Sequence, residues 1–295
     1  MKMMTLKEML PVAQKNHYGI GSFSPRNTFL IESVLQAAEN TQSPVIVQIS
    51  SNELTWFDCS AKRFADRFFA LKDQFSIPAV LHLDHTKDMD RIKEAIDAGF
   101  HSVMIDASAL EFDGNMAITR EVVEYAHAKG VSVEAELGRI LTTDKLETDQ
   151  DSLLYTVPEE AAEFVMKTGV DALAVSVGSA HGVYPVKDPK IDYERIEQIR
   201  KLTNIPLVLH GGSGLPAKTV QKAIALPTGG VSKINIATDL EIEFQRVMNV
   251  QRMPDVDVWK LDPAKLAEAG KAVQALVEDR IMNFLLSNGR ATEFV

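Results

Sequence analysis

Short apolar segments rich in β-branched residues alternate with longer amphipathic segments along almost the whole chain. The apolar runs are typical of buried parallel strands, and the amphipathic stretches are typical of helices that cover them. The predicted strands occupy residues 18–23, 45–49, 79–83, 102–105, 131–136, 172–177, 206–209 and 232–236. The helical pattern is clearest over residues 87–98, 116–129, 158–168, 193–202 and 216–226.

Eight strand–helix units without a break in composition predict an α/β protein with a parallel sheet. The sheet is either a closed (β/α)8 TIM barrel or an open, doubly wound sheet. No GxGxxG motif follows the first strand, so the dinucleotide-binding signature of the open sheet is missing. We therefore expect one barrel domain over residues 1–295, in which residues 263–295 form a C-terminal helical extension.

Composition and charge remove several functional classes. The 295 residues include 41 acidic and 31 basic side chains, a net charge of −10, which argues against a nucleic-acid-binding protein. No apolar run approaches the length of a membrane span, and the first residues lack the features of a secretory signal. The single cysteine, Cys59, rules out an internal disulfide and fits a reducing cytoplasm.

Groups that bind metals or move protons follow five of the eight predicted strands, and such strand ends converge on one face of a barrel. These groups are Asp84, His85, Asp106, Glu136, His181 and His210. Any one such histidine is more often a hydrogen-bonded structural residue, but their joint placement predicts a zinc site of imidazole and carboxylate ligands. Strand alternation places His82 on the side of Asp84, in the core or behind the ligands, and turns His85 to the opposite side.

A phosphate site is the second expectation. The segment HGGSG, residues 210–214, follows an apolar strand and precedes a helical pattern, so its backbone N–H groups can approach an anion. The last strand ends in NIATD, residues 235–239, before another helix. The loops after strands seven and eight form the recurring phosphate site of barrels. The residues alone therefore indicate a metal-dependent barrel enzyme that acts on a phosphorylated small molecule.

Six motifs resemble the class II, zinc-dependent ketose-bisphosphate aldolases, with the fructose- and tagatose-bisphosphate branch nearest. The motifs are HLDH (82–85), SVMIDAS (102–108), VEAELG (133–138), GSAHGVY (178–184), LVLHGGSG (207–214) and KINIATDL (233–240). Their order and spacing match the family over roughly residues 5–250. The resemblance implies a lyase of carbohydrate metabolism that is a cytoplasmic homodimer or homotetramer and contacts neither nucleic acid nor membrane. It leaves open a monovalent cation, Na⁺ or K⁺.

Carried over motif by motif, the resemblance assigns His85, His181 and His210 to zinc, with Glu136 as a further or alternate ligand. Asp84 is then the general acid/base on the hydroxyl beside the bond that breaks, and Asp106 supports the metal or an alternate metal site. The ketone half and its phosphate are assigned to Gly182, Gly211, Gly212, Ser213, Asn235, Ile236, Ala237 and Thr238. Ser50 matches a strand-two serine that contacts substrate.

The implied reaction is reversible cleavage of a ketose phosphate to dihydroxyacetone phosphate and an aldehyde. Zinc stabilises the enediolate as a Lewis acid, so no Schiff-base lysine is required. Lys233 lies in a predicted strand and follows the KINIATD pattern, which favours a structural role.

Three departures concern the aldehyde half. The family has an FNxNN segment after strand one where this chain has FSPRN, so Arg26, beside Asn27, is new; it either binds a second anion or pairs with a nearby acid. The loop after ELG lacks the family's glycine pair, and Asp144 or Glu147 would replace its acidic residue. HGVY is followed by Pro185 where relatives have lysine, and Lys187 comes two positions later.

Other functions remain as alternatives. One is an aldolase of the same mechanism that is specialised for a sulfonated or otherwise anionic aldehyde held by Arg26. Another is a non-catalytic barrel subunit of an aldolase complex, which predicts eroded metal ligands. The third is a zinc hydrolase, which leaves the two phosphate loops unexplained.

Overall fold

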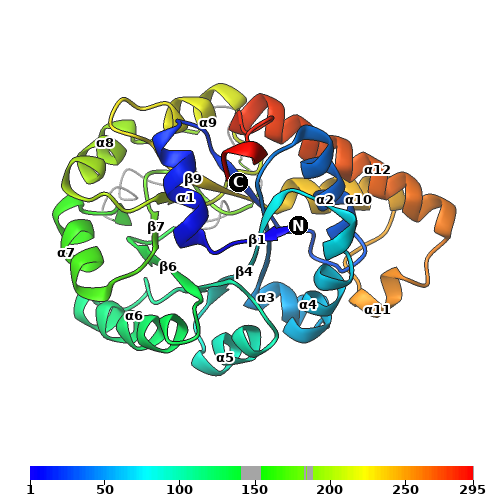
Figure 1. Ribbon diagram of the computed structural model, residues 1–295, viewed down its shortest axis with the longest axis horizontal. Helices are drawn as coiled ribbons and strands as arrows, with labels where there is room; N and C mark the ends of the chain where they lie inside the picture. Colours follow the sequence, from blue (N-terminus) through cyan, green and yellow to red (C-terminus); the bar gives the residue numbers. More distant parts are fainter. Residues whose placement is uncertain (141–153, 183, 185–188, 295) are drawn as a thin grey trace.

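The computed structural model describes residues 1–140, 154–182, 184 and 189–294. In these ranges nine strands form one all-parallel sheet, and eight of them, β2 to β9, close on themselves because β4 pairs with β5. Figure 1 shows the helices arranged as a ring around the strands. The predicted (β/α)8 TIM barrel is confirmed.

Each barrel strand coincides with a predicted strand to within a few residues, and β4 extends furthest beyond its prediction. The strands are β2 (Ile20–Phe23), β3 (Val45–Ser50), β4 (Pro78–Thr86), β5 (Ser102–Ile105), β6 (Ser132–Leu137), β7 (Ala172–Val175), β8 (Leu207–Leu209) and β9 (Val231–Ile236).

The helices begin and end at ordinary signals. In α7 (Pro158–Thr168), for example, the proline occupies the first turn and Gly169 closes the helix in the left-handed conformation. The others are α1 (Leu6–Lys15), α2 (Ile31–Thr41), α3 (Ser51–Trp56), α4 (Ala61–Ala70), α5 (Met89–Asp97), α6 (Phe112–His127), α8 (Tyr193–Leu202), α9 (Ala217–Ile224), α10 (Thr238–Met248), α11 (Asp255–Val258) and α12 (Pro263–Asp279).

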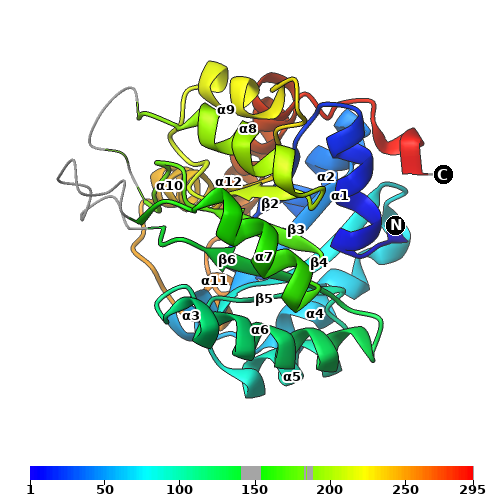
Figure 2. The same ribbon diagram turned by 90° about the vertical axis from the view of Figure 1, so that its left-hand side faces the viewer.

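The N-terminal segment closes one end of the barrel, which the hydrophobic pattern did not reveal. Strand β1 (Lys2–Met3) pairs with the start of β4, and a capping box of Thr5 and Glu8 then opens α1. The apolar face of α1 packs on inward-facing residues of the barrel strands, and Figure 2 shows it at one end of the barrel beside both chain termini.

The C-terminal extension packs within the chain. Helix α12 lies against α2 and α10 and continues into a π-helical turn, Arg280–Leu285. None of the helices in the described ranges combines the length and apolar character that a membrane crossing requires.

The barrel interior changes character along its axis. Near α1 it is apolar, but one layer higher it contains fully or almost fully buried polar side chains. This polar layer consists of Ser22, Gln48, His82, Glu134 and Lys233. Because inward positions alternate along a strand, the residues two places further on lie directly above it, at the C-terminal ends of the strands.

Truncation of the apolar face of α1 should affect stability alone. Leu10 on α1 is fully buried, so Leu10→Ala should lower the free energy of unfolding by about 2–5 kcal/mol. Urea unfolding measures this loss, and kcat should stay near the wild-type value because α1 lies at the opposite end from the site described below. The exposed Lys15→Ala on the same helix is the matched control, expected within about 0.5 kcal/mol of wild type.

Candidate active site

Asp84 and His85 are consecutive residues near the end of β4, and both line the same cavity of about 420 Å³. Regular alternation would turn them to opposite faces. The pairing of β4 with β5 instead shifts register between Leu83 and Thr86, and His85 adopts a φ of +40°. This local irregularity brings His85 to the side of Asp84, so the expectation that the two side chains point apart is wrong.

The ring nitrogens of His85, His181 and His210 converge at this end of the barrel. His85 Nε2 lies 3.0 Å from His181 Nε2 and 2.8 Å from His210 Nδ1, and the third separation is 3.4 Å. Nitrogens bound to one tetrahedral ion at about 2.0–2.1 Å are themselves roughly 3.3 Å apart. The three spacings therefore fit a single cation of a kind that imidazole binds, such as Zn, Cu, Fe or Ni.

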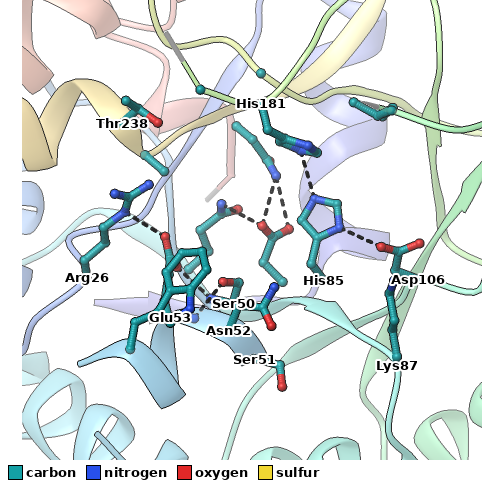
Figure 3. A pocket seen from close by; sticks show the side chains of 18 of the residues that line it. Arg26, Ser50, Ser51, Asn52, Glu53, His85, Lys87, Asp106, His181 and Thr238 are labelled. Atoms are coloured by element: carbon teal, nitrogen blue, oxygen red, sulfur yellow. Dashed lines mark hydrogen bonds and ion pairs between the residues drawn. The ribbon is translucent and has the colours of Figure 1, made fainter. Parts of the chain in front are cut away.

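Carboxylates orient two of these rings from behind. Asp106 Oδ2 lies 3.2 Å from His85 Nδ1, as Figure 3 shows, and Glu134 Oε1 lies 2.9 Å from His210 Nε2. A carboxylate that accepts the N–H of one ring nitrogen leaves the lone pair of the other nitrogen available for a metal. These hydrogen bonds determine which ring nitrogen of His85 and of His210 faces the centre of the cluster.

Glu136 on β6 supplies a fourth group. Its Oε1 accepts hydrogen bonds from Ser108 Oγ at 3.0 Å and from the Ile140 N–H at 3.2 Å. Among the described residues its buried Oε2 has no hydrogen-bond partner, and burial together with the charge of Asp106 raises the pKa of Glu136 to about 8. His85, Asp106 and Glu136 form a second possible ligand group, which fits Glu136 as a further or alternate ligand.

Asp84 is held as a carboxylate by donors from β3 and β9. Asn235 Nδ2 donates to its two oxygens at 3.1 and 3.3 Å, and Gln48 Nε2 donates to Oδ2 at 3.1 Å. Lys233 Nζ lies 3.9 Å from Oδ1, and His82 Nε2 lies 3.6 Å from the same oxygen. The carboxylate still lines the cavity, where it can accept a proton.

The charges of the site are strongly coupled. Burial disfavours ionisation of Asp84, but the charges of His85 and Lys233 and the hydrogen bond with His82 together outweigh it and hold the pKa of Asp84 well below its usual value. Burial also opposes a charge on His85, yet Asp84 and Asp106 raise the pKa of His85 to about 10. Burial and the positive charge of His85 lower the pKa values of His181 and His210. Without a metal, the proton of the cluster therefore resides on His85.

The opposite wall of the cavity is suited to an anion. Gly211 has a φ of +66°, and a Cβ there would lie 2.1 Å from the carbonyl oxygen of Ala180, so only glycine fits this close approach of two loops. Ser213 Oγ accepts the Ala237 N–H at 3.1 Å and joins this loop to the start of α10. The N-terminal turn of α10 faces the cavity, where its dipole favours negative charge.

The structure brings most of the predicted site residues together. Those that line the cavity are Asp84, His85, His181, Gly182, Gly211, Ser213, Asn235, Ala237, Thr238, Ser50 and Arg26. His210 and Glu136 are buried beside His85. Gly212, Ile236 and Asn27 do not line the cavity: Asn27 Oδ1 accepts the Leu30 N–H, and Gly212 packs on Ile234. Asp144, Glu147, Pro185 and Lys187 lie outside the described residues.

Arg26 lines the cavity but is already engaged. Its Nε lies 2.8 Å from Glu53 Oε1, as Figure 3 shows, and its Nη1 forms a second ion pair with Glu241. The side chain is buried, and Ser24 and the Ser50 N–H donate to the other oxygen of Glu53. Of the two roles open to Arg26, pairing with nearby acids is the one for which the structure contains contacts.

Sequence reasoning did not single out Glu134, Gln48 or Glu53. Glu134 was detectable in principle, because it alternates with Glu136 in VEAELG and must share its inward face. Gln48 and Glu53 carry no such signal, since a single amide in a strand and one acid in a helix are ordinary.

A closed barrel whose strand ends gather three imidazoles, several carboxylates and an anion-binding loop defines a metal-dependent barrel enzyme. Comparison with known proteins agrees with this class. Residues 4–290 match the family model described as fructose-bisphosphate aldolase class-II. The chain belongs to the class II fructose-bisphosphate aldolase family, and it is an aldolase, a lyase that acts on phosphorylated sugars.

Individual relatives are similar over nearly their whole length. The fructose-bisphosphate aldolase of Geobacillus stearothermophilus is 40% identical over 296 residues, which cover 99% of this chain and 100% of that protein. The Staphylococcus aureus Mu50 protein of the same name is 40% identical over 300 residues, 98% of this chain and 99% of that protein. The crystal structure of the YdjI aldolase from Escherichia coli K12 superimposes with a TM-score of 0.83 at 31% identity, covering 98% and 99% of the two chains.

Metal binding should release protons. At pH 7 the metal-free protein holds protons on His85 and Glu136, whose pKa values are raised to about 10 and about 8, and both groups must lose them to act as ligands. The apparent affinity for zinc should therefore increase with pH, by about tenfold or more per unit between pH 6 and 8. Calorimetry in buffers of different ionisation enthalpy measures the proton release. An affinity independent of pH would contradict this ligand set.

Proposed function

We propose that this aldolase is zinc-dependent and reversibly cleaves a ketose phosphate into dihydroxyacetone phosphate and an aldehyde. The observation that carries the proposal is the convergence of His85, His181 and His210 beside the carboxylate of Asp84 in one cavity. Glu136 is the further or alternate ligand. When bound, zinc supplies Lewis acidity that stabilises the negative charge developing on the ketone half.

Asp84 is the proposed general base. It accepts the proton of the hydroxyl next to the bond that breaks; the carbonyl of the aldehyde forms, and the electron pair of the broken carbon–carbon bond passes to the ketone half. Gln48 and Asn235 keep the carboxylate in place and ionised before the reaction. Protonation of the ketone half at its alpha carbon completes dihydroxyacetone phosphate, and Asp144 or Glu147 is the candidate for that step.

The phosphate of the ketone half is proposed to bind at Gly182, Gly211 to Ser213 and Asn235 to Thr238. The supporting features are the close backbone packing at Gly211 and the N-terminal turn of α10 at the cavity wall. Gly212 and Ile236 do not themselves line the cavity, and the Gly212 N–H donates to the Asn235 carbonyl at 2.9 Å, which joins the two segments. A homodimer or homotetramer, a cytoplasmic location and a monovalent cation stay predictions.

Metal removal and loss of the base should abolish cleavage in distinguishable ways. Chelation should eliminate activity while circular dichroism stays native, and added zinc should restore it. Asp84→Asn should lower kcat by about 10²–10⁴-fold while the protein retains one zinc per chain, measured by atomic emission. The exposed Asp90→Asn is the matched control and should keep wild-type kcat. Full activity of metal-free protein would contradict the mechanism, and product analysis by mass separates aldol cleavage from hydrolysis.

The second candidate is an aldolase of the same chemistry that prefers an anionic aldehyde held by Arg26. Arg26 lines the cavity, which favours this candidate, whereas its pairing with Glu53 and Glu241 opposes it. A panel of phosphorylated, sulfonated and neutral aldehydes, condensed with dihydroxyacetone phosphate, identifies the preferred partner.

Arg26→Met decides the role of that residue. Because two carboxylates already engage the guanidinium, the variant should lower the melting temperature and leave the ratio of kcat/KM for anionic and neutral aldehydes within about twofold. A selective loss of about tenfold or more for anionic aldehydes would support the second candidate instead. Arg246→Met, on the exposed side of α10, controls for the loss of a charge.

A further inference from the structure

Lys233 lies in the middle of β9 with no exposed surface, in the polar layer beneath the cavity. Its ammonium contacts three oxygen atoms of different residues. Nζ lies 2.8 Å from Asn235 Oδ1, 2.9 Å from Glu134 Oε2 and 3.9 Å from Asp84 Oδ1. An ammonium group has three donors and no acceptor, and this one donates a hydrogen bond to Asn235 and forms ion pairs with Glu134 and Asp84.

Through Glu134 the ammonium reaches a metal ligand. Glu134 has no exposed surface, one of its oxygens faces Lys233, and the other lies 2.9 Å from His210 Nε2. The carboxylate plane is therefore fixed at both ends. Because the ring nitrogen held by Glu134 is opposite the nitrogen that points towards His85, the same contact determines the direction of the metal-binding lone pair of His210.

Through Asn235 the ammonium reaches the proposed base. An Asn amide presents a carbonyl oxygen on one side and an NH₂ group on the other, so a donor at the oxygen determines where the NH₂ points. Lys233 donates to Asn235 Oδ1, and Asn235 Nδ2 consequently donates to both oxygens of Asp84. A flipped amide would place its oxygen against the carboxylate and its NH₂ against the ammonium, with repulsion at both contacts.

Two simpler roles fit Lys233 less well. A Schiff-base nucleophile must reach the carbonyl of the substrate, but this amine is completely buried and already bonded. Compensation of the buried charge of Glu134 accounts for one contact and leaves the bond to Asn235 without a role. His82, the other cationic candidate in the layer, lies 3.6 Å from both Asp84 and Glu134 and bonds Ser102 through its second nitrogen.

We propose that Lys233 is a positioning residue that holds the metal ligand His210, through Glu134, and the base Asp84, through Asn235, at a fixed separation. The inference rests on the proposed function for the roles of Asp84 and of zinc. One buried cation then sets the relative position of the base and the metal ligand. Lys233 does so without contact to substrate or metal.

Replacement by an apolar side chain of similar length tests the proposal. Lys233→Met should weaken zinc binding by about 10–100-fold and lower kcat by roughly 10²-fold, with KM little changed, because the alignment of groups is lost rather than substrate contacts. Competition with a chromogenic chelator gives the zinc dissociation constant, and steady-state kinetics at saturating zinc gives kcat and KM. Lys201→Met, an exposed lysine on α8, should leave all three at wild-type values.

A double variant separates positioning from charge compensation. In Lys233→Met/Glu134→Gln no unpaired carboxylate is left buried, and the Gln oxygen can still accept from His210. Thermal stability and zinc affinity should recover. By contrast, kcat should stay roughly 10²-fold below the wild-type value, because no donor orients the amide of Asn235. The double variant removes the charge of Glu134 together with that of Lys233. It therefore serves as the test if the Lys233→Met protein does not fold.

Two results would overturn the proposal: wild-type kcat in Lys233→Met, or recovery of kcat in the double variant. Failure of the proposed function gives a different result, namely wild-type protein that cleaves no ketose phosphate. In that event the zinc dissociation constants decide, and equal constants for wild type and Lys233→Met overturn the role assigned to Lys233.

Discussion

The close approach of three imidazole nitrogens is the contact around which the rest of this structure is arranged. Rings of His85, His181 and His210 lie within 3.4 Å of one another through these nitrogens, and each comes from a different strand end. Two of the three rings are restrained from behind. Asp106 and Glu134 provide that restraint, so acidic groups sit beneath the histidines, and Lys233 must then accompany Glu134.

This arrangement requires a barrel that is polar in its upper interior, where burial of charge is costly. An isolated carboxylate or ammonium in such a place costs several kcal/mol, and the cost is offset only when every charge is paired and hydrogen-bonded. Glu134 and Lys233 satisfy this condition, each without exposed surface. The apolar layer and α1 below them supply the compensating hydrophobic stability. The barrel therefore divides its interior into an end that stabilises the fold and an end that carries the chemistry.

The sequence allowed much of this to be predicted, because alternation along strands and the convergence of strand ends are general properties of barrels. The eight barrel strands, the clustering of the histidines and the place of the HGGSG segment were visible on those grounds. The turn of His85 depends on a local irregularity that periodicity does not encode. The partners of Arg26 come from α3 and α10, and long-range pairs of this kind cannot be read from one chain. Strand β1 is too short to leave a pattern.

The contact between Gly211 and the carbonyl of Ala180 has a consequence for how such an enzyme can diversify. The two loops that carry His181 and His210 touch through backbone atoms, with no room for a side chain between them. Any residue larger than glycine would move these loops apart and change the distance between these two histidines. This corner therefore has almost no freedom to vary, whereas the wall formed by α3 and the segment around Arg26 is held together by side-chain contacts. Exchange of side chains on that wall leaves the backbone contact, and with it the spacing of the two histidines, unchanged.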